Sequence, residues 1–294
     1  MPEFEFDGND LARLASLTYS PALATRAALA GSHRVRRAGH GSDFLDYRAY
    51  VPGDDVRRID WLVFARLRQP FVRVLEHEDT LFVSMLVDVS RSMAAGSPRS
   101  KAALACQLAC GLAHVATSSG DHVTATTFSD ALGPLLCNLR GRTALPRLIA
   151  ALRAAPTGGT ADLPTVTRAF CREVRHRGLV VLMSDFLGVG DVEEAVNMLV
   201  ARRFRVLLVQ ILDAVDRGEG LEGPIRLRDS ETGRVLDMVA SDERIRAYQQ
   251  RLANYCDNLQ AMCVRRGQDY LPADTADSYL SLLATGLREQ RLLR

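Results

Sequence analysis

Residues 81–93 read LFVSMLVDVSRSM, and this stretch decides the fold. From Phe82 to Val87 the chain is a nearly unbroken apolar run, and the run ends abruptly at Asp88. Such a run is typical of a strand that is buried on both faces of a parallel sheet. Because ligands bind just past the carboxyl ends of strands in open α/β sheets, we expect a site in the polar residues that follow.

Downstream of this strand, apolar strand-like runs alternate with helical patterns. This alternation predicts an α/β fold with a doubly wound, mainly parallel sheet and helices on both faces. The elements we expect, in chain order, are a helix at 100–118, a strand at 122–128, a short edge strand at 134–137, helices at 142–154 and 162–177, a strand at 179–183, a helix at 191–203, a strand at 205–212, a hairpin of 225–227 with 235–239, a helix at 242–266, a strand at 269–271 and a closing helix at 277–291.

The first 79 residues differ in character, which predicts an N-terminal extension at 1–79 ahead of an α/β domain at 80–294. We expect helix at 10–30, irregular structure at 39–61, where Gly, Asp, Arg and aromatic residues are dense, and a half-exposed strand at 71–78. The charged cluster in this extension either pairs internally or forms a second interaction surface. Its members are Asp54, Asp55, Arg57, Arg58, Asp60 and Trp61.

Composition narrows the class of protein. A net charge of +2 with 47% hydrophobic residues is ordinary for a soluble globular chain and gives no indication of nucleic-acid binding. The six cysteines lack metal-site spacing, which predicts buried reduced thiols and a reducing compartment. The acidic amino terminus has no apolar segment of a signal peptide, and no apolar run reaches the roughly 18–20 residues of a membrane span. We therefore expect a cytoplasmic protein without an integral membrane segment.

Three strand-to-helix loops carry polar clusters that a doubly wound sheet would bring to one edge. Together they offer two carboxylates and three hydroxyls, which are hard oxygen ligands suited to Mg²⁺ and also to Mn²⁺. Neutral hydroxyls leave a metal electron-poor, so a carboxylate from a partner would complete its shell. This predicts a binding device rather than an enzyme. The metal-site candidates are Asp88, Ser90, Ser92, Thr160 and Asp185.

Each candidate also has a structural explanation. Asp88 would cap a turn or the following helix, Thr160 would cap a helix at 161–177, and Asp185 would be an ordinary strand-end carboxylate. Two other functions stay open. A metal-dependent phosphohydrolase would use Asp88, although Ser90 stands where a haloacid dehalogenase-type phosphatase has a second acid. A scaffold would leave the site unoccupied. The chain has no G-x-x-x-x-G-K-[ST] loop for nucleotide hydrolysis.

Two sets of motifs resemble known families. DVSRSM after the buried strand, GGTAD in mid-domain and SD at the end of a later strand resemble the metal-ion-dependent adhesion site of von Willebrand factor type A domains. The upstream segment GSDFLDYRAYVPGDDVRRIDWLVFAR, followed by FVRVLEHED, resembles the bacterial proteins grouped as domain of unknown function 58. This second resemblance extends over about residues 33–215.

The resemblances imply a fold and a role. A von Willebrand type A-like, Rossmann-like sheet would hold a metal at the five candidate positions. The genes of the bacterial family commonly lie beside those of MoxR-type AAA+ ATPases. The implied function is that of a Mg²⁺-dependent adaptor or co-chaperone, whose partner is a MoxR-type ATPase, or a client of that ATPase, that offers an Asp or Glu to the metal.

Overall fold

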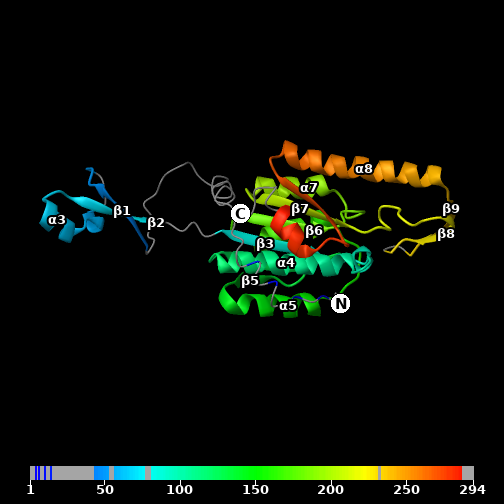
Figure 1. Ribbon diagram of the computed structural model, residues 1–294, viewed down its shortest axis with the longest axis horizontal. Coiled ribbons are helices and arrows are strands. Elements are labelled where there is room, and N and C mark those ends of the chain that lie inside the picture. Colours follow the sequence, from blue (N-terminus) through cyan, green and yellow to red (C-terminus); the bar gives the residue numbers. More distant parts are fainter. Residues whose placement is uncertain are drawn as a thin grey trace. The chain divides into compact units, whose positions relative to one another are not determined.

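The chain forms two compact units, Met1–Gly31 together with Leu81–Arg294, called here the α/β unit, and Ser32–Thr80, called the small unit. The computed structural model describes Phe4, Phe6, Asp10, Leu14 and residues 43–52, 56–76, 81–230 and 233–286 (Figure 1). We expected one extension over 1–79, but the structure groups residues 1–31 with the α/β unit. The reason is hydrophobic packing, because Phe4 and Leu14 are buried in the core of that unit.

The small unit is built on an antiparallel pair of strands. Strand β1 (Asp43–Ala49) pairs with β2 (Phe71–Glu76), and between them lie a 3₁₀ turn (Val56–Arg58) and helix α3 (Trp61–Leu67). The prediction of irregular structure at 39–61 was wrong for β1. Its sequence lacks a clear alternation, and pairing with β2 supplies the backbone hydrogen bonds that hold it extended.

A six-stranded sheet forms the centre of the α/β unit, in the order β10-β7-β6-β3-β4-β5. All neighbouring pairs are parallel except β4 with the edge strand β5, which is antiparallel. This confirms the predicted mainly parallel α/β sheet. The strands are β3 (Phe82–Asp88), β4 (His122–Phe128), β5 (Leu136–Leu139), β6 (Leu179–Ser184), β7 (Arg205–Leu212) and β10 (Asp269–Asp274).

Helices cover both faces of this sheet, as Figure 1 shows for α4 and α5 on one side and α7 and α8 on the other. Side chains alternate along β3, so Val83, Met85 and Val87 join the core with α4 and α5, while Leu86 joins the core with α6, α7 and α8. The helices are α4 (Lys101–Ser118), α5 (Ala144–Ala154), α6 (Leu163–Glu173), α7 (Val192–Ala201) and α8 (Asp242–Arg265).

The strand order reverses direction next to β3. From β3 the chain crosses to β4 on one side, and it later returns to β6 on the other side of β3. In open α/β sheets such a switch point is where ligands bind, just outside the carboxyl ends of the two strands. Asp88 ends β3, and Asp185 follows the last residue of β6. The topology therefore brings two of the predicted site residues to the same place.

The remaining elements lie in the C-terminal third. The predicted hairpin is present as β8 (Gly223–Arg228) and β9 (Val235–Ala240). The predicted closing helix is only a short α9 (Tyr279–Ser281) followed by a π-helical segment (Leu282–Gly286), and residues 287–294 lie outside the described part. The predicted helix at 10–30 is described only at Asp10 and Leu14, both helical. Among the described helices, none is long and apolar enough to cross a membrane.

Candidate metal site

Asp88 is placed by β3 at the carboxyl edge of the sheet and is fully buried. Its Oδ1 accepts a hydrogen bond from the Ser90 backbone N at 2.8 Å, and its Oδ2 accepts one from Ser184 Oγ at 2.6 Å. Burial raises the pKa of this carboxyl group to about 6, although the hydrogen bonds from Ser184 and Ser90 oppose the shift. In the part of the chain that the structure describes, no lysine, arginine or histidine forms an ion pair with Asp88. Within the described residues, its negative charge is therefore not compensated by a side-chain cation.

Two hydroxyls follow Asp88 in the same loop. Ser90 Oγ is 3.2 Å from Ser92 Oγ, with Ser90 buried and Ser92 half-buried at the start of a 3₁₀ turn (Ser92–Ala94). The cap of α4 is Ser100, whose side chain accepts from Ala103 N. Asp88 therefore does not cap that helix, and only its short-range bond to Ser90 N matches the structural explanation of its role.

The loop that carries Thr160 is joined to this same segment by its backbone. Gly158 N donates to Val89 O at 2.9 Å, and Arg91 N donates to Gly159 O at 3.1 Å. Both glycines have positive φ angles, 143° and 80°, which a side chain would strain. Thr160 is exposed beside these contacts, and the N-cap of α6 is Asp162. Thr160 therefore does not cap the helix, so this alternative explanation is excluded, and its place in a metal site stays a prediction.

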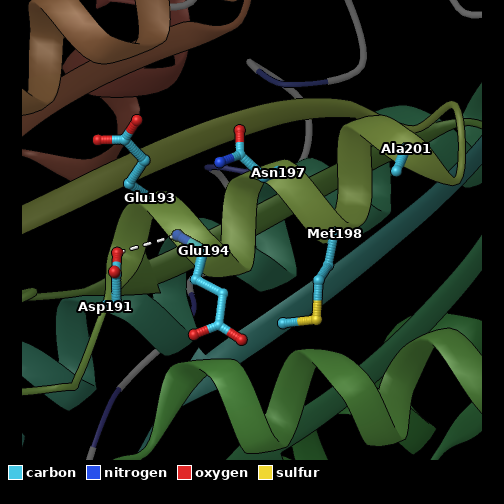
Figure 2. A pocket seen from close by; sticks show the side chains of 6 residues that line it. All are labelled: Asp191, Glu193, Glu194, Asn197, Met198 and Ala201. Atoms are coloured by element: carbon cyan, nitrogen blue, oxygen red, sulfur yellow. Dashed lines mark hydrogen bonds between the residues drawn. The ribbon is translucent and has the colours of Figure 1, made fainter.

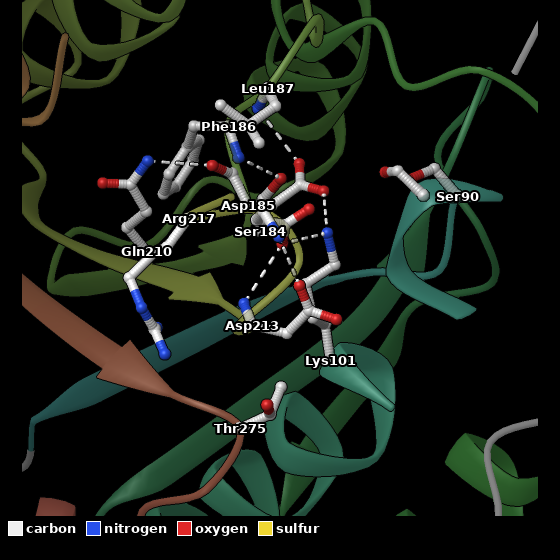
Figure 3. A network of polar contacts seen from close by, with 12 residues as sticks. Ser90, Lys101, Ser184, Asp185, Phe186, Leu187, Gln210, Asp213, Arg217 and Thr275 are labelled. Atoms are coloured by element: carbon white, nitrogen blue, oxygen red, sulfur yellow. Dashed lines mark hydrogen bonds and ion pairs between the residues drawn. The ribbon is translucent and has the colours of Figure 1, made fainter. Parts of the chain in front are cut away.

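Asp185 is buried at the end of β6, the neighbour of β3. Its Oδ1 accepts from Leu187 N at 3.0 Å, and Gln210 Nε2 donates to its backbone O at 2.9 Å (Figure 3). The next residue, Phe186, has a φ of 55°, an uncommon conformation for a buried aromatic residue. Phe186 N donates to Ser184 Oγ at 3.0 Å, so the backbone just after Asp185 is bonded to the same hydroxyl that donates to Asp88.

Lys101 was not among the predicted site residues. It is the single lysine of the chain and is 1% exposed. Its Nζ lies 2.7 Å from Asp185 Oδ2 and 2.7 Å from Asp216 Oδ2. Burial lowers the pKa of Lys101, but attraction by the two carboxylates outweighs it and the net pKa is raised, so the side chain is charged. The sequence contained one signal that could have identified Lys101. It is a lysine at the first position of a helix, where the helix dipole disfavours a cation.

The donor set fits a divalent cation. Each carboxylate oxygen that accepts one hydrogen bond keeps a second lone pair, so Asp88 and Asp185 can still bind a metal. With Ser90, Ser92 and Thr160 the ligands are all oxygens, as Mg²⁺ prefers. Among the described residues there is no group of three or more His, Cys, Asp or Glu that could hold a metal ion. The candidate site itself offers two carboxylates, those of Asp88 and Asp185. Any metal held here depends on hydroxyls and further oxygen ligands.

The buried charge of Asp88 predicts a pH dependence of stability in EDTA. Since its pKa is about 6 in the folded protein and 3.8 ordinarily, the folded state binds the extra proton between these values. The free energy of unfolding should therefore rise as the pH falls from 7 to 4, by about 2 kcal/mol from this group. Urea unfolding at several pH values, with Asp88→Asn as the control, measures it. If the free energy of unfolding depends on pH equally in wild type and Asp88→Asn, the prediction is contradicted.

A separate hollow of about 560 Å³ runs along α7 and is lined by Asp191, Glu193, Glu194, Asn197, Met198 and Ala201 (Figure 2). Its acidic side chains already have partners. Asp191 caps α7, Glu194 pairs with Arg168, and Glu193 pairs with Arg266. The hollow contains none of the predicted metal-site residues, and its carboxylates serve the fold.

The charged cluster of the small unit is only partly described. Asp54 and Asp55 lie outside the described residues, as does the side chain of Arg58. Asp60 is 4% exposed; it caps α3 through Leu62 N and Val63 N and accepts a hydrogen bond from Tyr47 Oη. Trp61 is 62% exposed, and Arg57 is exposed as well. Asp60 therefore stabilises the small unit, while Trp61 presents an aromatic surface.

Comparison with known proteins identifies relatives of unknown function. Residues 46–257 match the family model described as "Protein of unknown function DUF58". An uncharacterized protein of Mycobacterium tuberculosis, Rv1480, is 32% identical over 236 residues, which cover 74% of this chain and 71% of that protein. An uncharacterized protein of Mycobacterium avium, MAV169, is 38% identical over 89 residues, which cover 30% of this chain and 52% of the relative.

Two solved structures show distant similarity to this chain. The conserved hypothetical protein BatB from Bacteroides thetaiotaomicron has a TM-score of 0.43 and 13% identity, covering 71% of this chain and 98% of that one. An aerotolerance-related membrane protein from Bacteroides fragilis has a TM-score of 0.44 and 15% identity, covering 71% and 99%. The fold described above follows from the strand order of this chain itself.

Proposed function

Since this chain belongs to the DUF58 family of proteins of unknown function, we propose a function from its own residues, that of a Mg²⁺-dependent protein-interaction module. In this proposal the α/β unit is a von Willebrand factor type A-like domain. The metal-ion-dependent adhesion site would consist of Asp88, Ser90, Ser92, Thr160 and Asp185. When bound, the metal would supply a positive centre for a carboxylate of a partner protein.

One observation carries the proposal: Asp88 is fully buried at the switch point of the sheet and has no cation partner among the described residues. A buried carboxylate is costly unless it is paired or bound to a metal. Its backbone and hydroxyl hydrogen bonds hold the carboxylate in place but leave its charge uncompensated. A divalent cation bound to Asp88 would remove this cost, and the hydroxyls of Ser90 and Ser92 follow directly in the chain.

A phosphohydrolase that uses Asp88 as nucleophile is less well supported. The side chain is fully buried and both of its oxygens accept hydrogen bonds. A nucleophile must approach the phosphorus of a substrate directly. In addition, Ser90 stands at the position where such a phosphatase would need a second acid as general acid. Binding of a partner to a metal does not require that approach.

The proposed partner is a MoxR-type AAA+ ATPase or a client of that ATPase, as the resemblance of the upstream motif implies. We expect a purified MoxR-type ATPase from the same genome to be captured by the immobilised protein in Mg²⁺ and released by EDTA. Asp88→Asn should abolish the capture. The proposal fails if capture is equal in Mg²⁺, in EDTA and with the variant.

We also propose a second contact surface on the small unit, centred on Trp61 and Arg57. The exposed indole motivates it, since aromatic residues and arginine often carry the binding energy of interfaces. In the same capture assay, Trp61→Ala should weaken binding about tenfold or more, the size of a typical hot-spot residue. Leu67→Ala, which truncates another exposed apolar residue of α3, is the matched control.

A further inference from the structure

The single lysine of the chain lies beside the proposed metal site, in a position that is unfavourable for a cation. Lys101 opens α4, where the helix dipole repels positive charge, and its side chain is buried. Figure 3 shows it reaching from the start of α4 toward Asp185. A buried ammonium is retained in such a place only if carboxylates pair with it closely. The two contacts at 2.7 Å, to Asp185 and Asp216, provide this pairing.

We propose that Lys101 is an internal cation that holds Asp185 while the metal is absent and pairs with Asp216 alone when the metal binds. The inference rests on the proposed metal function of this site. It assigns to Lys101 and Asp216 a role in setting metal affinity, although neither belongs to the five predicted ligands.

The two carboxylates that Lys101 contacts are not equivalent. Asp185 lies at the switch point beside Asp88, whereas Asp216 lies in the loop after β7. If Asp185 were the only partner, its transfer to a metal would leave a buried ammonium unpaired. Because Asp216 Oδ2 is equally close, Lys101 can give up Asp185 and stay paired. The second carboxylate therefore makes the exchange of cations possible.

Asp216 is held firmly enough to act as the second partner. Its backbone N donates to Asp213 Oδ1 at 2.7 Å, and Asp213 N donates to its Oδ2 at 3.1 Å. Tyr248 of α8 donates from its Oη to the Asp216 backbone O at 2.6 Å. These contacts fix the loop on α8.

Asp88 and Asp185 differ in whether a described cation pairs with them. No described cation pairs with Asp88, whereas Asp185 is neutralised by Lys101. A metal that enters the site finds one carboxylate that no described side-chain cation pairs with and one that Lys101 already neutralises. The ammonium therefore lowers metal affinity, and a partner carboxylate becomes more important for holding the metal.

Isothermal titration with Mn²⁺ tests the competition. In Asp216→Asn, Lys101 has only Asp185 left, and the Kd should rise. In the double variant Lys101→Met with Asp216→Asn, the competing cation is gone and the Kd should fall. Each change should be on the order of tenfold, the effect of one close charge on ionic affinity. The matched control is Glu219→Gln, which removes an exposed carboxylate of the same loop and should leave the Kd within about twofold of wild type.

Nuclear magnetic resonance gives a second readout on the wild-type protein. With ¹⁵N-labelled lysine, the chain contains one side-chain ammonium, that of Lys101. Saturation with Mg²⁺ should shift this signal in wild type and leave it unchanged in Asp88→Asn. A metal that binds without moving the signal would overturn the exchange.

The outcomes separate the two proposals. A Kd for Mn²⁺ that rises in Asp216→Asn and falls in the double variant supports the exchange. Binding by the double variant when wild type binds no Mn²⁺ supports it as well. Equal Kd values in wild type and both variants overturn the role of Lys101 and leave the metal site standing. No binding by any of the three proteins overturns the exchange and the proposed metal function together.

Discussion

Asp88→Asn is expected to abolish the stabilisation of the protein by Mn²⁺ or Mg²⁺. In wild type, a metal at about 100 times its Kd that binds only the folded state should add about 2.7 kcal/mol to the free energy of unfolding. The variant keeps the shape of the side chain and can still accept from Ser184 Oγ, but it loses a buried carboxylate that no described side-chain cation pairs with. Thermal unfolding with EDTA and with each metal measures the effect.

The variant also separates a metal site from a damaged fold. In EDTA at pH 7, Asp88→Asn should be at least as stable as wild type, because it removes an uncompensated buried charge. The matched control is Asp162→Asn, which changes a carboxylate in a neighbouring loop that caps α6. The control should keep the metal-dependent shift. A shift of equal size in Asp88→Asn and wild type would exclude Asp88 as a ligand.

The sheet could be predicted because its strands carry the signal locally. Phe82–Asp88 and Leu179–Ser184 are continuous apolar runs that stop at polar residues, and burial on both faces requires such runs. The hairpin β8–β9 also has a local signal in its turn residues. Strand β1 was missed since its residues, rich in charge, become extended only by pairing with β2, a partner that is distant in the sequence.

The candidate site was predictable only in part, for a similar reason. Asp88, Ser90 and Ser92 follow one another at the end of a strand, so their proximity needs no tertiary contact. Lys101 meets Asp185 across 84 residues and Asp216 across 115. No pattern of spacing indicates such a pairing, which arises when the start of α4 packs beside the ends of β6 and β7. A single lysine among many arginines distinguishes Lys101 in the sequence, but it does not indicate that Asp185 and Asp216 are its partners.

Lys101→Met is expected to destabilise the protein by about 3–5 kcal/mol in EDTA, the usual cost of removing one member of a buried ion pair. Asp185 and Asp216 would lose their common cation, and Asp185 is fully buried. The exposed pair of Arg168 with Glu194 provides the control, and Arg168→Met should cost less than about 1 kcal/mol. Urea unfolding at pH 7 compares the two losses.

The destabilisation caused by Lys101→Met should become smaller when Asp185 and Asp216 are neutralised as well. Adding Asp216→Asn to Lys101→Met relieves one unpaired carboxylate, and adding Asp185→Asn relieves the other, so stability should recover stepwise. A buried ion group replaced as a whole by neutral side chains often costs little. If the triple variant is no more stable than Lys101→Met alone, then the loss comes from packing of the lysine stem at the start of α4. The charges of Asp185 and Asp216 would in that case not be what keeps a lysine in this position.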